Sequence, residues 1–452
     1  MKQKSLSAPC PKSAARLRKT ALLCLPFLVL AVYFIVWHTN GDLTMGDDPF
    51  FSASLGWLSL PEWLVLRWNT WTSRQLLDLP LVLMARSAHA QLLWGAVSTL
   101  CLLAIAFCLT RLCSKQTPLT CALACLMTGL IWTAAPFDCG MLTLSAIYLW
   151  PLAATAFCLL PLRTARSLRW YQWLLCLPCL VYAANNEQLC VALFLLFASA
   201  AALRFFGDAA HRAGPCIYPL CGMAICSVML AIHLLCPGNA ARRIANYEWF
   251  VDYDMLTLPQ KLELGASGTV SGMLLTPSLA WGLFYLVLAA VCILRCRGLL
   301  FRILGCAPAA LWLFFGVLPN FLPEPLRSIL TIGTRLTQQG SIYLENHSVP
   351  TAYLFPALML TFAFLLLAAV YVALGHTQRA LAALLILLIG FSSRMTLIFS
   401  PSVWASGLRT HLVLQFCCAA VGMLLADSLP ALRAHRNTPS RADAPRDSAQ
   451  KR

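Results

Sequence analysis

Charged residues are scarce in this chain of 452 residues, at 11% of the sequence against about 25% in ordinary soluble domains. Hydrophobic residues make up 60%, and this combination excludes a soluble globular enzyme. It also excludes a disordered chain, because disorder requires low hydrophobicity and high net charge. The solvent that remains is the lipid bilayer, so we expect an integral membrane protein.

The alternation of hydrophobic and polar residues that is typical of a membrane β-barrel strand is also missing. Hydrophobic residues instead form unbroken runs, such as the one over residues 21–37. A membrane-spanning helix needs about 20 mostly apolar residues. The predicted fold class is therefore all-α: a polytopic integral membrane helix bundle of about twelve spans, over residues 20–38, 91–112, 118–135, 143–162, 170–184, 188–206, 215–236, 276–294, 303–320, 351–374, 380–398 and 410–427.

Acidic residues are few, 17 against 33 Lys and Arg. Twelve spans with the N-terminus inside leave most basic residues on the inner side and most acidic residues outside, as the positive-inside rule requires. We therefore expect both termini in the cytoplasm. The predicted division is a basic cytoplasmic segment over residues 1–19, the membrane bundle over 20–427 and a basic, disordered cytoplasmic tail over 428–452.

A disulfide framework is not expected, although the chain has 21 cysteines. Nearly all of them fall inside the apolar runs, where a free cysteine behaves as a small hydrophobic residue. The long outer loops, residues 39–90, 237–275 and 320–350, are rich in Trp, Arg, Asp and Asn. Loops of this length are usually functional or disordered, and these are too hydrophobic for disorder. We place the active surface there.

Two adjacent carboxylates, Asp47 and Asp48, follow the first predicted span. One of them could act as a general base toward a hydroxyl group, or both could hold a divalent cation, Mg or Mn, that bridges to a phosphate. The alternative is a solvated turn before a helix, because Gly46 and Pro49 flank the pair and both are turn residues.

Residues 60–86 predict an interfacial helix rich in Trp and Leu. Its residues Arg67, Trp71, Arg74 and Asp78 have spacings that place them on one stripe of a helix. The planar fork of arginine suits bidentate contact with a phosphate. The alternative is that Trp and Arg only anchor the helix among lipid headgroups.

Three further sites carry charge near the expected outer surface. Glu187 lies in the polar group of residues 185–187, which predicts a turn between the fifth and sixth spans. An ionisable residue near a bilayer is a functional candidate, and the alternative is that Glu187 pairs with an outer arginine such as Arg242 or caps the sixth span. Pro237 and Gly238 end the seventh span and precede Asn239, Arg242 and Arg243. Arg409 lies in the short loop before the last span. These arginines run against the positive-inside bias, so their placement needs an explanation.

Taken together, these elements resemble the polytopic GT-C type glycosyltransferases, and more closely a bacterial membrane family of unknown function related to the O-antigen glucosyltransferases. The matching elements extend over residues 40 to 420. They are the pair Asp47–Asp48, the Trp-Thr-Ser-Arg of residues 71–74, the Asn-Asn-Glu of 185–187, the Pro-Gly-Asn-x-x-Arg of 237–242, and Ser400–Pro401 with Arg409–Thr410. The juxtamembrane motif departs from the family, which has Ser-Gly before its arginine.

The resemblance implies a GT-C-like bundle with outer juxtamembrane helices in a bacterial inner membrane. It implies that the enzyme moves a sugar from a polyprenyl-phosphate donor to an envelope glycan or lipid acceptor on the outer face. Asp47 or Asp48 would be the base or a metal ligand, and Glu187 would line the same cavity. The donor phosphate would be held by the polar and basic residues Arg67, Arg74, Asn239, Arg242, Arg243 and Arg409.

Two other function classes remain open. One is a transporter or flippase for a lipid-linked or anionic solute, in which sites lie near the middle of the bilayer on broken helices. The other is a non-catalytic membrane protein of a polysaccharide assembly complex. The sequence favours the enzyme, because its ionisable residues collect near the outer ends of the predicted spans and no internal repeat is evident.

Overall fold

The structure, a computed structural model, describes residues 11–41, 43–133, 141–163, 168–207, 215–339, 353–375 and 377–436. Helices build these parts of the chain, and no strand occurs among them. The predicted all-α polytopic membrane bundle is confirmed.

Nine segments of the described chain are helices long and apolar enough to cross a membrane. They lie in α1 (Pro11–Thr39), α5 (Ala90–Cys113), Leu142–Arg163, α11 (Glu187–Phe206), α13 (Ile217–Leu235), Leu299–Val317, α19 (Leu354–Leu374), Gln378–Phe399 and Leu408–Leu429. A tenth span is formed if α15 (Leu258–Leu274) and α16 (Leu279–Arg295), bent by 79°, count as one. The helices α6 (Pro118–Thr133) and α10 (Trp170–Ala184) are apolar but shorter. Each of the twelve predicted segments therefore coincides with an apolar helix.

Three of the longer segments combine several helical elements. Leu142–Arg163 consists of α8 (Leu142–Leu144), the π-helix η1 (Ser145–Leu149), α9 (Trp150–Leu159) and a 3-10 turn, η2 (Leu160–Arg163). Leu299–Val317 joins α17 (Leu299–Trp312) to a second π-helix, η5 (Leu313–Val317). The last two segments contain α20 (Gln378–Met395) with η8 (Thr396–Phe399), and η9 (Leu408–His411) with the start of α21 (Leu412–Arg436).

The turn expected between the fifth and sixth spans is present. Helix α10 ends at Ala184 and α11 begins at Glu187. Between them the Asn186 side chain accepts a hydrogen bond of 3.1 Å from the backbone N–H of Leu189. This is an N-cap, which satisfies one of the donors that the first turn of a helix leaves unpaired. The polar residues therefore divide what would otherwise be one long apolar helix.

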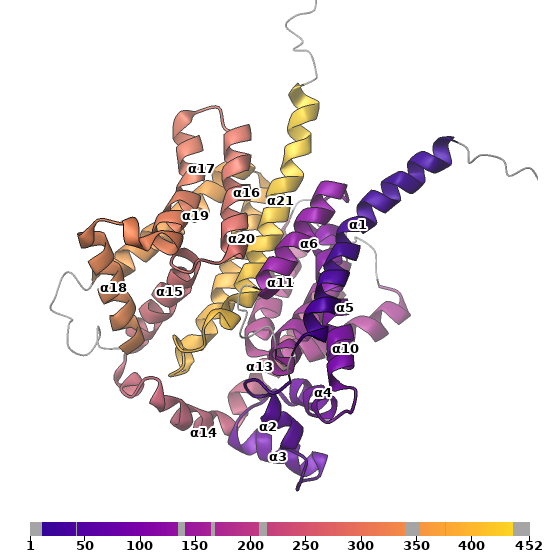
Figure 1. Ribbon diagram of the computed structural model, residues 1–452, viewed down its shortest axis with the longest axis vertical. Helices are drawn as coiled ribbons and strands as arrows, with labels where there is room; N and C mark the ends of the chain where they lie inside the picture. Colours follow the sequence, from indigo (N-terminus) through magenta and orange to yellow (C-terminus); the bar gives the residue numbers. More distant parts are fainter. Residues whose placement is uncertain are drawn as a thin grey trace, which may run out of the picture.

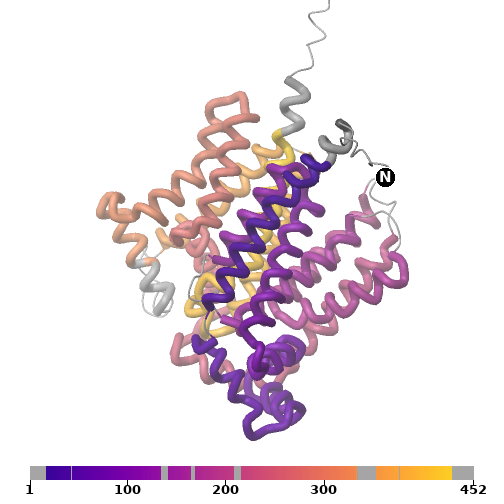
Figure 2. The backbone as a smooth tube through the Cα atoms, turned by 45° about the vertical axis from the view of Figure 1, so that its right-hand side comes forward, coloured from indigo at the N-terminus to yellow at the C-terminus, as the bar shows by residue number. Residues whose placement is uncertain are grey.

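The two ends of the bundle differ in construction. The start of α1 and the end of α21 lie at the same end (Figure 1), and both helices extend beyond the limits of 20 and 427 that we expected for the bundle. Short helices lie across the opposite end (Figures 1 and 2). These are α2 (Asp48–Ala53), α3 (Leu60–Thr70), α4 (Gln75–Ala85) and α14 (Gly238–Ala245). This second end is called the cross-helix end below.

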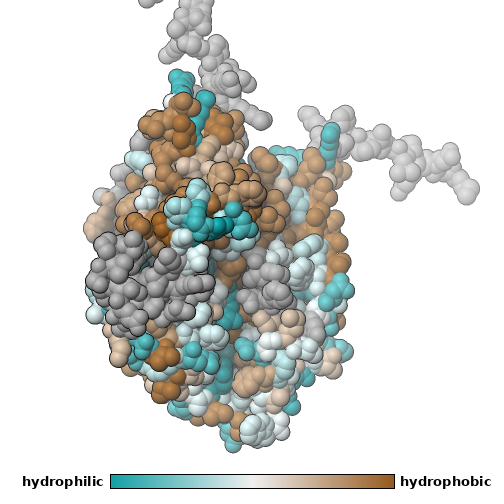
Figure 3. Space-filling model, turned by 60° about the vertical axis from the view of Figure 1, so that its left-hand side comes forward, coloured by the Kyte–Doolittle hydropathy of each residue, from teal (hydrophilic) through white to brown (hydrophobic). Residues whose placement is uncertain are grey.

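Helix α21 is central to the bundle, because it packs against α20, α16, α6 and α5. It contributes buried residues to two large hydrophobic clusters, one with α1, α5, α6 and α9 and the other with α15, α16, α19 and α20. Much of the surface is hydrophobic, with hydrophilic side chains more frequent toward the cross-helix end (Figure 3). A hydrophobic outer surface is what a helix bundle in lipid requires.

Candidate functional site

Asp48 holds the start of α8 and does not face a cavity. It is 2% exposed. Its carboxylate accepts hydrogen bonds from the backbone N–H of Leu142 at 2.8 Å, from the N–H of Thr143 at 2.8 Å and from the Thr143 hydroxyl at 2.5 Å. Burial raises the pKa of Asp48, whereas these three donors act in the opposite direction. Asp47, by contrast, is exposed and lines the cavity described below.

The predicted continuous helix over residues 60–86 is wrong, because the chain breaks between α3 and α4. The cause lies in the turn at residues 185–187, between the fifth and sixth predicted spans. There the Asn185 side chain accepts hydrogen bonds from the backbone N–H of Leu76 at 2.8 Å and of Leu77 at 3.3 Å. Its amide nitrogen donates to the carbonyl of Ser73 at 3.1 Å. A side chain distant in the sequence thus caps α4 and fixes residues 71–74 as a turn.

Arg67 and Asp78 form an ion pair across this break, with 3.0 Å between Nε and Oδ2. We expected them on one stripe of one helix, but they meet because α3 and α4 fold against each other. The Arg67 guanidinium also lies over the rings of Phe50, Phe51 and Trp63, at 5.5 to 5.7 Å from their centroids. Burial raises the pKa of Asp78, and Arg67 opposes that shift.

Glu187 joins two arginines from different segments. Its carboxylate lies 2.7 Å from Arg74 Nε and 4.0 Å from an Arg242 terminal nitrogen. Burial opposes the charge on Arg74, but the Glu187 carboxylate outweighs it and the pKa of that guanidinium is raised. Burial and the nearby Arg74 lower the pKa of Arg242. Glu187 therefore acts as a clamp between two cations, in line with the structural alternative considered for it.

The Pro-Gly-Asn motif brings α14 close to α3. A Cβ atom at Gly238 would lie 2.5 Å from the backbone nitrogen of Trp71 and 2.8 Å from the carbonyl oxygen of Trp68, so only glycine allows this approach. Asn239 donates a hydrogen bond of 2.6 Å to the carbonyl of His233 at the end of α13. Asn239 thus closes the preceding helix, although the resemblance implied that it binds phosphate.

Arg242 and Arg243 are neighbours on α14 with different surroundings. Arg242 lines the cavity and approaches Glu187. Arg243 forms an ion pair with Asp254 and stacks over the ring of Tyr253, and it does not line the cavity. Hydrogen bonds from Tyr247 and Arg243 lower the pKa of Asp254. Of the two arginines implied to hold phosphate, only Arg242 is in position to do so.

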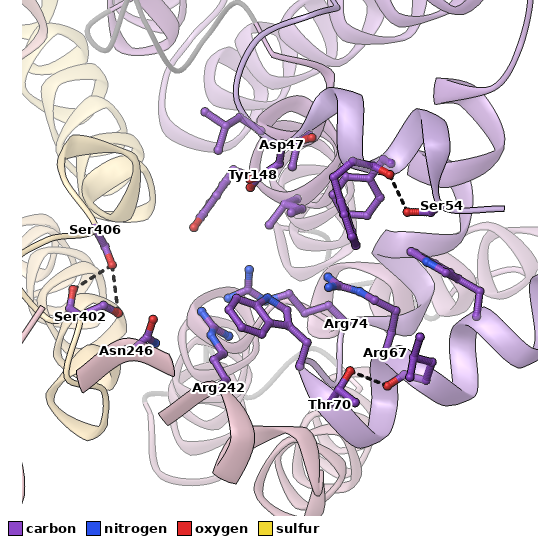
Figure 4. Close-up of a pocket in the computed structure, with 18 of the residues that line it drawn as sticks. Asp47, Ser54, Arg67, Thr70, Arg74, Tyr148, Arg242, Asn246, Ser402 and Ser406 are labelled. Carbon is purple, nitrogen blue, oxygen red and sulfur yellow. Dashed lines mark hydrogen bonds between the residues drawn. The ribbon is translucent and has the colours of Figure 1, made fainter. Parts of the chain in front are cut away.

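The cavity at the cross-helix end has a volume of about 630 Å³. Five of the predicted site residues line it, although they are spread from the first outer loop to the last: Asp47, Arg67, Arg74, Arg242 and Arg409. In Figure 4, Arg67, Arg74 and Arg242 lie on one side, Asp47 and Tyr148 on the opposite side, and Ser402 with Ser406 on a third. A cationic wall therefore faces a carboxylate across an open space.

Sequence reasoning missed several residues of this cavity. They include Tyr148, Trp57, Trp249, Asn246, Ser402 and Ser406. Tyr148 lies within a predicted membrane span and gave no signal of its own. Ser402 and Ser406 belong to the loop between the last two spans, which the family resemblance matched only at its ends. Their hydroxyl groups make hydrogen bonds within that loop, so this wall offers polar groups on an ordered turn.

The loop before α21 is joined to the turn that holds Glu187. Gln188 donates a hydrogen bond of 3.1 Å to the carbonyl of Thr410, and Arg409 Nε donates one of 3.0 Å to the carbonyl of Ser406. Behind this loop lies Arg394, which is 3% exposed and donates to the carbonyl of Val403 at 2.7 Å. The motifs at 185–187 and 400–410 thus form one framework.

The aspartate pair does not fit a shared divalent cation. The Asp48 oxygens already accept three hydrogen bonds, and Asp48 is not among the residues that line the cavity with Asp47. Within the described ranges no group of three His, Cys, Asp or Glu side chains has the geometry of a metal site. Asp47 is therefore the carboxylate available to a ligand in this cavity.

Comparison with known proteins gives no relative: the chain matches no family model, no curated protein and no solved structure.

Proposed function

We propose that this protein is a membrane glycosyltransferase that moves a sugar from a polyprenyl-phosphate donor to an envelope glycan or lipid acceptor. The observation that carries the proposal is the cavity at the cross-helix end, where four arginines and one exposed carboxylate line the same space at the end of a membrane bundle. Sugar transfer from a lipid phosphate needs these two groups on opposite sides of the anomeric carbon.

The arginine wall suits the phosphate of the donor. Arg67 and Arg74 are held in place by Asp78 and Glu187 through their Nε atoms. This arrangement orients the guanidinium groups before a ligand arrives, and a preorganised donor stabilises developing charge better than a mobile one. A bound phosphate at Arg74 and Arg242 would lie beside Glu187, whose proposed role is to position these cations.

Asp47 suits the acceptor side. It lies with Tyr148 across the cavity from Arg74 and Arg242 (Figure 4), and it is exposed, so an acceptor hydroxyl can reach it. A general base must come within hydrogen-bond reach of the proton that it removes. Trp57, Trp71 and Trp249 also line the cavity, and indole rings are typical of the membrane interface, where a lipid donor meets a water-soluble acceptor.

The location follows from the same proposal. The start of α1 and the end of α21 lie at the end of the bundle opposite the cross-helix end (Figure 1). The positive-inside rule puts these two ends of the chain in the cytoplasm. The cavity would then open on the outer face of a bacterial inner membrane, where sugars activated by nucleotides are absent and lipid-linked sugars are the available donors.

The test is a transfer assay in proteoliposomes with radiolabelled polyprenyl-phosphate sugars and an envelope-glycan extract, with and without divalent cation. We expect label to enter the glycan. Asp47→Asn should lower the rate about 100-fold to 10,000-fold, the usual range for loss of a general base, with unchanged thermal unfolding. Arg242→Gln should also slow transfer, and Arg243→Gln, on the next residue of the same helix, is the matched control.

Two results would contradict the proposal. Transfer at the wild-type rate by Asp47→Asn would remove Asp47 from the chemistry. No transfer from any donor, together with movement of the intact labelled lipid between leaflets or uptake of an anionic solute, would indicate a flippase or a transporter instead.

A further inference from the structure

The arginines that line the cavity or lie behind it outnumber the carboxylates around them. Arg67 is paired with Asp78 at 3.0 Å, and Arg74 is paired with Glu187 at 2.7 Å. Arg242 approaches the same Glu187 only to 4.0 Å. One carboxylate thus serves two guanidinium groups, and Arg242 has no acid of its own among the described residues.

Two further arginines lack acidic partners in the described part of the chain. Arg409 lines the cavity, and its Nε donates to a backbone carbonyl. Arg394 is buried behind the loop that includes Ser402 and Ser406; its Nε and one terminal nitrogen have no hydrogen-bond partner. Arg394 donates a hydrogen bond of 2.7 Å to the carbonyl of Val403, which directly follows the cavity-lining Ser402. Its charge therefore lies just behind this wall of the cavity.

Counting this shell gives two positive charges in excess. The cations are Arg67, Arg74, Arg242, Arg394 and Arg409, and the acids are Asp47, Asp78 and Glu187. Uncompensated charge is costly away from water, and its interaction with a ligand is stronger there than in water. A ligand with two negative charges would balance this shell.

We propose that the cavity binds a phosphate monoester dianion more tightly than a phosphodiester, so that it favours the lipid phosphate that leaves over the sugar-linked donor that enters. This inference rests on the proposed sugar transfer. In that reaction the acceptor oxygen bonds to the anomeric carbon and the bond from that carbon to the phosphate oxygen breaks. Its electron pair stays on the phosphate, and the acceptor proton passes to Asp47.

The charges of this step explain why the preference matters. The donor phosphodiester carries one negative charge and the released monoester carries two, while Asp47 loses its charge as it takes the proton. A site that is complementary to the second phosphate charge stabilises the transition state more than the bound donor. The same complementarity makes the lipid phosphate a tightly held product.

The lining of the cavity has no side chain whose ordinary pKa lies near neutral pH. No histidine, cysteine or lysine is among its lining residues. The nearest histidine contact to the Arg74 turn is His233, whose ring lies between the Ser73 hydroxyl at 2.7 Å and the Ala184 carbonyl at 2.9 Å. A carbonyl only accepts, so one ring nitrogen donates to it, whereas the Ser73 hydroxyl can donate to the other ring nitrogen or accept from it.

The experiment compares two probes, farnesyl phosphate and its methyl ester, on the purified full-length protein in detergent. Binding is followed by the fluorescence of the cavity tryptophans. At pH 8 we expect the monoester to bind about tenfold more tightly or better, since one strong charge-assisted interaction has this effect. At pH 5 the preference should shrink several-fold, because the second phosphate pKa is about 6 and most of the monoester is then a monoanion like the methyl ester.

Variants locate the effect. Arg409→Gln and Arg242→Gln should each reduce the preference at pH 8, whereas Arg243→Gln should keep it. Thermal unfolding of each variant separates loss of binding from loss of fold, and Arg242→Gln serves if Arg409→Gln does not fold.

Equal affinity of the two probes at pH 8 would overturn the inference even if sugar transfer is observed. Inorganic phosphate that binds as tightly as farnesyl phosphate would also overturn it, because the site would then take free phosphate and not a lipid. A monoester preference without transfer from any donor would support the charge selectivity and count against the transferase alone.

Discussion

In two pairs of adjacent, chemically identical residues, one member faces the cavity and the other does not. Asp47 faces the cavity, while Asp48 is buried and holds the start of α8. Arg242 faces the cavity, while Arg243 is paired with Asp254 on the surface. Successive helix residues point about 100° apart, as follows from 3.6 residues per turn. Residue type therefore indicates which part of the chain belongs to a site, whereas the fold determines which of two adjacent residues faces the cavity.

The largest effect on stability should come from replacing Asp48, the buried member of the acidic pair. Asp48→Ala removes three hydrogen bonds and leaves the backbone N–H groups of Leu142 and Thr143 buried without that acceptor. We expect a loss of about 2 to 4 kcal/mol in the free energy of unfolding, measured by thermal unfolding in detergent. Asp47→Ala is the control and should unfold as the wild type does; equal unfolding of both variants would contradict the division.

A smaller effect should follow from adding one methyl group where α14 meets α3. In Gly238→Ala the new Cβ would meet backbone atoms of Trp71 and Trp68 that cannot rotate aside. We expect about 1 to 3 kcal/mol of destabilisation, typical of overpacking, together with weaker phosphate binding because Arg242 moves with the helix. Gly268→Ala is the control, since nothing lies within 4 Å of a Cβ there. Equal unfolding temperatures for Gly238→Ala and Gly268→Ala would show that the close approach of α14 to α3 does not require glycine at position 238.

The cap that fixes the break between α3 and α4 should contribute less. Asn185→Ala leaves the N–H groups of Leu76 and Leu77 without their side-chain acceptor, which should cost about 0.5 to 2 kcal/mol. The displaced Arg74 should also slow transfer. Asn69→Ala, which removes an exposed side chain bonded to its own helix, should change neither the unfolding temperature nor the rate.

The smallest effect is expected at the surface ion pair. Arg243→Gln breaks the pair with Asp254 where both side chains are nearly half exposed, so the free energy of unfolding should change by less than about 0.5 kcal/mol. The transfer rate should stay at the wild-type value. A marked fall in transfer would show that the neighbouring arginines do not divide as described.

The membrane helices could be predicted from the sequence because length and hydropathy suffice for them. The turn at residues 185–187 was predictable for the same reason, since a single apolar helix over that stretch would be too long for a bilayer. That Arg67, Arg74 and Arg242 share one site was implied only by the family resemblance, because the first two lie in one predicted outer loop and the third in another.

Other parts of the site depend on contacts that no local pattern carries. The break after α3 is imposed by Asn185, which lies 109 positions from its partner Leu76. A local pattern therefore predicted one helix where there are two. Tyr148 is a member of a hydrophobic span, and its place in the cavity wall follows from how that span packs against α2 and α4. Asn239 is polar and near the arginines, but its side chain is used to close α13.

The links that hold the cavity together also set the order in which it can form during synthesis. Arg74 and Glu187 are 113 positions apart, and Gln188 and Thr410 are 222 apart. A chain emerging from the ribosome has Arg67 and Arg74 in place long before the wall with Ser402, Ser406 and Arg409 exists. The complete cavity can arise only after the loop before the last helix has been made, because Ser402, Ser406 and Arg409 belong to that loop. A chain cut short before residue 402 would retain the two arginines at Glu187 and lack this wall.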